Sequence, residues 1–211
     1  MQPARVVARL AFAYAELDAR IRWRSHQTPT FDAQLAAGPF TTLVAFLPQS
    51  FAAELAASVA ALPALAEHFR YPPAQLHMTV RNLDGADLAS LPVLLNGLQP
   101  ISLCAGGLGF TRETLLLRLL TVNSTLRCLR MRLDGLPGMR HGRLALHDLA
   151  FANVLRFNGP IASELRRSVG RRPDALAGRE IELDELTLIR TDKVGSPAHS
   201  EVLGRYSLGA V

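Results

Sequence analysis

The chain has 211 residues, 49% of them hydrophobic and 19% charged, which indicates a folded protein and excludes an intrinsically disordered one. The net charge of +5 comes almost entirely from arginine, since Lys193 is the only lysine, and it suits an anionic ligand without identifying one. No apolar run reaches the length of about 18 residues that a membrane helix needs. The two cysteines, Cys104 and Cys128, have neither metal-site nor disulfide-framework spacing. We therefore expect a reduced, cytoplasmic protein with no metal, no cofactor and no membrane partner.

The first 38 residues are predicted to form an N-terminal helix and a connecting loop. Apolar residues recur in steps of three and four from Val7 to Ile21, so residues 3–24 favour an amphipathic helix that packs on the rest of the chain. Arg9 and the charged residues after it argue against a secretory signal. Mostly polar or small residues, including Pro29, then favour a loop over residues 25–38. Residues 39–211 are expected to form a single domain with two lobes.

Strands and helices alternate through this second part. Apolar and β-branched runs predict strands, while Asn, Ser, Pro and Gly mark the ends of helices. The expected strands cover residues 41–47, 76–83, 101–111, 114–122, 149–157, 181–190 and 202–208. The expected helices cover residues 51–62, 86–98, 123–133 and 160–170.

The order of these elements contains a coarse internal repeat. Each half offers strand, helix, strand and helix, and each second strand carries a similar heptapeptide. The first is His-Met-Thr-Val-Arg-Asn-Leu at 77–83, and the second, 74 residues later, is Phe-Ala-Asn-Val-Leu-Arg-Phe at 151–157. This separation exceeds solenoid periods of about 20–50 residues. We therefore expect two related lobes that face each other.

The first heptapeptide carries groups that suit phosphoryl chemistry. His77 and Thr79 are two residues apart in an expected strand, so their side chains leave the same face. Arg81 shares this face if the strand stays regular. The hydroxyl and the guanidinium can hold phosphate oxygens, while the imidazole moves a proton.

The chain resembles the two-histidine phosphoesterase superfamily, particularly its bacterial 2′-5′ RNA ligase-like branch. The resemblance lies in an apolar strand that enters a His-x-Thr motif within residues 71–80, in the strand–helix order from about 41 to 208, and in the closing Tyr206-Ser207-Leu208. It implies hydrolysis or ligation at 2′,5′ or 2′,3′-cyclic phosphate linkages without a metal, with one histidine as base and a second as acid. Together with the repeat, it predicts an α+β fold of two pseudo-symmetric lobes. Each lobe would be a mostly antiparallel sheet with helices on its outer face, and a central cleft would lie between the sheets.

The second motif departs from the pattern of the superfamily. By position, Phe151 stands where relatives carry histidine, and Asn153 stands where they carry threonine. Phe151 cannot transfer a proton, whereas Asn153 can still donate a hydrogen bond to a phosphate oxygen. His147, His141 and His199 are candidates to replace the missing histidine, although each also suits a solvated loop.

Three functions stay open at this point. The first is a cyclic phosphodiesterase acting on 2′,3′-cyclic phosphate or 2′,5′-linked nucleotides or RNA, with His77 as the proton-transfer residue and Arg81 and Asn153 holding the phosphate. The second is an impaired relative that binds a nucleotide, an RNA end or another small anion in the same cleft. In either case Tyr71, which also suits packing, is a candidate to stack on a base. The third is a cleft lined by Phe151 that accepts an unrelated apolar ligand.

Overall fold

The computed structural model describes residues 28–60, 62, 68–139, 149–161, 163–171, 176–195 and 199–209. The predicted helix over residues 3–24 lies outside these ranges, as do His141 and His147. Within the predicted loop, α2 (Phe31–Leu35) is a helix that was not expected, and its Gln34 Nε2 donates to Phe157 O at 3.0 Å. This part of the loop therefore packs on the body of the protein, and the domain boundary at residue 38 stays a prediction.

Most of the observed elements follow the predicted order. The other helices are α3 (Gln49–Ala60), α4 (Leu91–Leu95), α5 (Thr125–Leu133) and α6 (Ser163–Arg171), with a 3₁₀ turn, η2 (Pro73–Gln75). The strands are β1 (Phe40–Phe46), β2 (Phe69–Arg70), β3 (His77–Asn82), β4 (Ile101–Phe110), β5 (Thr114–Thr121), β6 (Ala150–Arg156), β7 (Glu180–Leu183), β8 (Glu185–Thr191) and β9 (Glu201–Ser207).

Two predicted elements differ from the observed ones, and β2 and η2 were not predicted. The helix expected over residues 86–98 is reduced to α4, which begins beside Pro92 because proline is tolerated only in the first turn of a helix. The strand expected over residues 181–190 is divided at Asp184 into β7 and β8. In the sheet, β7 and β8 are not neighbours, although they are adjacent in the sequence.

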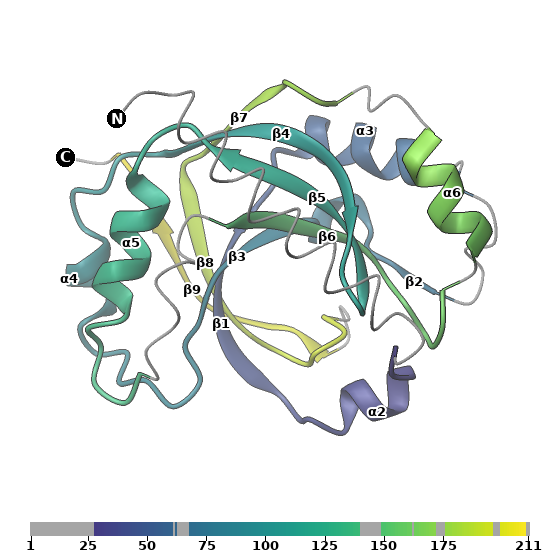
Figure 1. The fold of residues 1–211 in the computed structure, drawn as a ribbon. Coiled ribbons are helices and arrows are strands. Elements are labelled where there is room, and N and C mark those ends of the chain that lie inside the picture. Colours follow the sequence, from purple (N-terminus) through teal and green to yellow (C-terminus); the bar gives the residue numbers. More distant parts are fainter. Residues whose placement is uncertain are drawn as a thin grey trace.

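The nine strands among the described residues form one sheet in the order β7-β4-β5-β6-β3-β1-β8-β9, with β2 paired to β6. β7 and β8 stand six strand positions apart, which is about 29 Å in a flat sheet. Only Asp184 separates them in sequence, and the two Cα–Cα steps across it span about 7 Å at most. The sheet must therefore curl until its two halves approach each other, and Figure 1 shows this curl with α3, α4, α5 and α6 on its outer side.

The helices cover the outer face of the curled sheet. Met78 of β3 and Ala152 of β6 are fully buried there, in one core with Leu55 of α3 and Leu129 of α5. The predicted α+β class is confirmed, with antiparallel pairing throughout the described strands and helices outside. The strands form one sheet where two were expected, and the pseudo-symmetry of two lobes and the central cleft stay predictions. No helix in the described ranges is long and apolar enough to cross a membrane.

Candidate functional site at the centre of the sheet

The two motif strands are neighbours at the centre of the sheet. β3 and β6 pair antiparallel at Met78 and Ala152, the middle residues of the two motifs. Because both residues point to the helix-covered face, the residues on either side of them point to the opposite face, which we call the inner face. The side chains that surround this point on the inner face are therefore those of His77, Thr79, Phe151 and Asn153.

His77 is held in one tautomer. Its Nδ1 lies 2.7 Å from Gln75 O, and since a carbonyl only accepts, Nδ1 carries the proton. Nε2 of the neutral ring is then a proton acceptor. Burial lowers the pKa of His77, the hydrogen bond to Gln75 opposes this shift, and the positive charge of Arg156 adds to it. The imidazole is therefore neutral at pH 7, which is the form that a general base needs.

A buried arginine holds the two motif strands at the point where their pairing ends. Arg130 of α5 donates from Nε to Val80 O at 2.7 Å, from Nη2 to Thr79 O at 3.0 Å and from Nη1 to Leu149 O at 2.6 Å. The first two carbonyls belong to β3, and the third immediately precedes β6. Arg130 therefore satisfies backbone groups that the short β3–β6 ladder leaves unpaired. The sequence carries no signal for this role, because an arginine on a helix is ordinarily exposed.

Arg81 was predicted to share the inner face with His77 on the condition that the strand stays regular, and β3 does not meet this condition. The register of β3 against β1 slips by one residue after Thr79, so Val80 forms a β-bulge. The bulge turns Arg81 to the helix-covered face, where its Nη2 lies 2.6 Å from Asp134 Oδ1 at the end of α5. Arg81 therefore has a structural ion pair there, and the predicted contact with phosphate is withdrawn.

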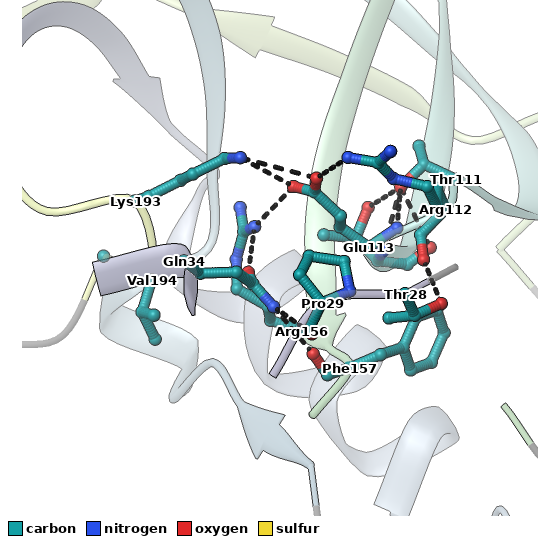
Figure 2. Close-up of polar contacts among 12 residues, drawn as sticks. Thr28, Pro29, Gln34, Thr111, Arg112, Glu113, Arg156, Phe157, Lys193 and Val194 are labelled. Carbon is teal, nitrogen blue, oxygen red and sulfur yellow. Dashed lines mark hydrogen bonds and ion pairs between the residues drawn. The ribbon is translucent and has the colours of Figure 1, made fainter. Parts of the chain in front are cut away.

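A corresponding bulge in β6 brings a different arginine to the inner face. The register of β6 against β5 slips at Val154, so that Arg156 pairs with Thr114 on the same face as the motif residues. Arg156 is buried, and its Nη1 donates to Gln34 Oε1 at 2.8 Å and to Glu113 Oε2 at 3.3 Å (Figure 2). Strict alternation along the predicted strand would have placed this residue on the other face.

Glu113, in the hairpin between β4 and β5, lies among three cations (Figure 2). Arg112 Nη2 lies 2.8 Å from its carboxylate, Arg156 Nη1 3.3 Å and Lys193 Nζ 3.4 Å. Partial burial raises the pKa of Glu113, but the hydrogen bond from Arg112 and the charges of Lys193 and Arg156 outweigh it and hold the pKa below its usual value. The cluster is therefore net positive, and it joins this hairpin to the loop that follows β8.

For Tyr71 the sequence left two roles open, packing and stacking on a base, and its contacts favour packing. Its side chain is only 3% exposed. The hydroxyl donates to Val194 O at 2.7 Å and accepts from Arg156 Nε at 3.2 Å. The ring meets the ring of His77 edge-on, with 6.4 Å between the centroids. Tyr71 therefore supports the imidazole from behind and offers no face to a ligand.

The second motif supplies an amide and an aromatic ring at the place where a proton carrier was expected. Phe151 and Asn153 are half-buried. Asn153 Oδ1 is buried and accepts no hydrogen bond from any described residue, while the amide nitrogen is a donor that suits a phosphate oxygen. His199 lies in a loop, where its Nδ1 is 2.8 Å from Asp192 Oδ2, and its side chain is 64% exposed. Among the described residues, the partner of His199 is therefore Asp192 and not His77. The described residues contain no group of three or more metal-ligating side chains.

Comparisons with known proteins bear on the fold. No family model and no curated protein matches the sequence. Among solved structures, TT0787 of Thermus thermophilus is 20% identical with a TM-score of 0.54, over 80% of this chain and 97% of that one. A phosphoesterase is 13% identical with a TM-score of 0.56, over 82% of this chain and all of that one. E. coli LigT in complex with 3′-AMP is 14% identical with a TM-score of 0.57, over the same shares.

LigT has also been crystallised with ATP, with phosphate and with NADP+. At these identities the likeness concerns the fold. The chain therefore has the fold of these solved structures, E. coli LigT among them.

Proposed function

We propose that this protein is a metal-independent phosphodiesterase that opens 2′,3′-cyclic phosphates or cleaves 2′,5′ linkages at a nucleotide or RNA end. The observation that carries the proposal is the fixed tautomer of His77, whose Nδ1 is bound to Gln75 O so that the neutral Nε2 can accept a proton. Thr79 and Asn153 share the inner face with it and supply a hydroxyl and an amide for phosphate oxygens. The nucleotide and phosphate complexes of LigT support the choice of ligand class.

The reaction needs one proton removed and one supplied. His77 Nε2 accepts the proton of a water molecule as its oxygen bonds to phosphorus, and the bond from phosphorus to the departing ribose oxygen breaks. In relatives a second histidine would protonate that oxygen. Phe151 cannot, so water must supply the proton here, and loss of such a partner typically slows a reaction by about 10²–10⁴-fold.

The position of Phe151 favours a second candidate, in which the same site binds a phosphate-bearing nucleotide or RNA end without turnover. Antiparallel pairing at Met78 and Ala152 relates Phe151 to His77 by the local two-fold axis of the strand pair. An aromatic ring therefore stands at the place of the missing acid. Binding by Thr79 and Asn153 does not need that acid.

One set of assays separates the two candidates. Wild type, His77→Ala and the double variant Phe151→His with Asn153→Thr are each given 2′,3′-cyclic nucleotides and a cyclic-phosphate-ended RNA, with products resolved by chromatography. We expect slow wild-type turnover, its loss in His77→Ala and a faster rate in the double variant. If wild type and the double variant both bind these ligands tightly but do not turn them over, the second candidate, binding without catalysis, is favoured. Neither binding nor turnover in any of the three proteins would refute both candidates.

A further inference from the structure

Three apolar side chains on the inner face are buried, although the helices α3, α4, α5 and α6 all lie on the other side of the sheet (Figure 1). Val44 of β1, Leu116 of β5 and Ile189 of β8 are 0%, 1% and 6% exposed. In each strand the preceding residue belongs to the core beneath these helices, so alternation turns the three side chains to the inner face. The remaining described helix, α2, contacts Arg156 at the end of β6. The described helices therefore do not account for the burial at the centre of this face.

A second layer must cover these side chains, because a sheet buries a face only by packing it against another element. Among the described residues, the extensive contacts between strands all join neighbours in the sheet, so its two halves do not cover each other. The exposed fractions hold for a single chain, so the cover is not a second copy. It must come from outside the described ranges, where residues 1–27 are the longest stretch and residues 140–148 the next.

The first of these stretches has the length and the apolar pattern that the inner face needs. Its apolar residues at steps of three and four are Val7, Leu10, Tyr14, Leu17 and Ile21. As a helix, residues 3–24 would be about 33 Å long. β5 and β8 stand four strand positions apart, which is about 19 Å in a flat sheet and less in a curled one. One helix laid across the strands can therefore reach both Leu116 and Ile189.

The described chain begins at the rim of the inner face. Thr28 Oγ1 donates to Arg112 O at 2.7 Å, and Gly159 N donates to Pro29 O at 3.3 Å (Figure 2 shows Thr28 and Pro29 beside Arg112). Arg112 immediately precedes the start of β5, and Leu116 is four residues farther on, at most about 13 Å away. The four Cα–Cα steps from residue 24 to residue 28 span at most about 14 Å. A helix that ends near residue 24 is therefore within reach of Leu116.

We propose that the inner face is the docking site of this chain's own N-terminal segment, residues 3–24, packed as an amphipathic helix over Val44, Leu116 and Ile189. Leu116 pairs with Asn153 and Val44 pairs with Thr79, so a helix that contacts both leucine and valine passes over the motif residues. The helix therefore competes with a ligand of the site, a consequence that rests on the proposed function. The segment is an intramolecular inhibitor of binding at this face.

Photo-crosslinking in the full-length chain tests the docking directly. Benzoylphenylalanine replaces Phe46, a half-buried aromatic residue of the inner face that pairs with His77. In the control protein it replaces Val93 of α4, which is 77% exposed on the other side of the sheet. Mass spectrometry of proteolytic peptides then identifies the residues reached after irradiation. We expect the probe at position 46 to reach residues 3–24 in a product of monomer size, and the probe at position 93 not to reach them.

Three results of this experiment would overturn the docking. The first is a probe at position 46 that reaches another part of the chain, such as residues 140–148, and never residues 3–24. The second is a product that joins position 46 only to a second copy of the chain. The third is the absence of any product that contains residues 3–24.

Two glutamate substitutions test which side of the helix docks. Leu17→Glu places a charge within the apolar stripe, whereas Ala8→Glu, nine residues earlier and thus about two and a half turns away, places it on the opposite side. Leu17→Glu should lower the yield of crosslinking from position 46 by roughly tenfold, because a lone buried carboxylate is costly. Ala8→Glu is the matched control and should leave the yield unchanged. Equal effects of the two substitutions in folded protein, checked by thermal melting, would contradict docking through this stripe.

The affinity for uridine 3′-monophosphate, measured by calorimetry, tests the competition separately. If the helix is docked for about nine-tenths of the time in wild type, its release in Leu17→Glu should tighten binding by up to about tenfold, while Ala8→Glu should bind as wild type does. Equal affinities in wild type and Leu17→Glu would reject the competition, and the docking would stand on the crosslinks. If none of these proteins binds the nucleotide, the competition and the ligand class of the proposed function both fail, and the crosslinks alone decide the docking.

Discussion

Replacement of Arg130 by methionine tests whether this buried arginine holds the centre of the sheet together. The substitution keeps an unbranched side chain of similar length and removes donors to three carbonyls, those of Thr79, Val80 and Leu149. A hydrogen bond from a charged group contributes about 1.5–3 kcal/mol, and a buried carbonyl left without a donor costs about 1–3 kcal/mol. Because the three bonds share one guanidinium and are not additive, we expect a loss of about 3–5 kcal/mol in the free energy of unfolding.

Urea denaturation followed by circular dichroism measures this loss. With a slope of about 2–3 kcal/mol per molar urea, the midpoint should fall by roughly 1–2 M. The control is Arg132→Met, two residues farther along the same helix, whose guanidinium donates to Leu94 O and Asn96 O at the exposed surface. It should shift the midpoint by no more than about 0.3 M. If Arg130→Met and Arg132→Met behave alike, the assignment of Arg130 as the group that joins β3 to β6 is refuted.

The site itself yields three more testable expectations. The turnover rate should rise with pH as His77 loses its proton. Because burial lowers the pKa of His77, the pH at which the rate is half-maximal should lie below about 6.5 in a pH–rate profile. Tyr71→Phe removes the hydroxyl that bonds Val194 and Arg156 and should lower stability by about 1–2 kcal/mol in thermal melts; an unchanged melting temperature would contradict this. Glu113→Gln should destabilise the protein by about 1 kcal/mol at pH 7. Because the folded pKa of Glu113 is depressed, its stabilisation is present above the unfolded pKa of about 4.5 and is lost as the pH falls through the folded pKa. The urea midpoints of variant and wild type should therefore converge as the pH is lowered.

The strands of this fold were predictable from the sequence because their signal is local. Runs such as that of β5 and the two heptapeptides have the composition of strands, and turn residues mark their ends. The placement of His77 and Thr79 on one face also needed nothing beyond alternation. The pairing of Met78 with Ala152 agrees with the repeat, although a sequence alone does not say which strands are neighbours.

The errors come from backbone irregularities and from tertiary partners. A one-residue bulge at Val80 moved Arg81 to the other face, and a bulge at Val154 brought Arg156 inward. A bulge depends on the pairing of two strands, so a single strand gives little warning of it. The burial of Tyr71 depends on a hydrogen bond to Val194, more than a hundred residues away.

The direct connection from β7 to β8 through Asp184 has a consequence for how the chain folds. β7 pairs with β4 and β8 pairs with β1, so the segment around Asp184 supplies partners to both halves of the sheet at once. A nascent chain that has not yet extended to residue 180 leaves β1 and β4 with unpaired backbone edges, which are templates for association with other chains. β1 pairs with a strand some 150 residues downstream, so closure of the sheet should be slow. A chaperone that shields the edges of β1 and β4 should therefore raise the yield of refolding more than one that binds the helices.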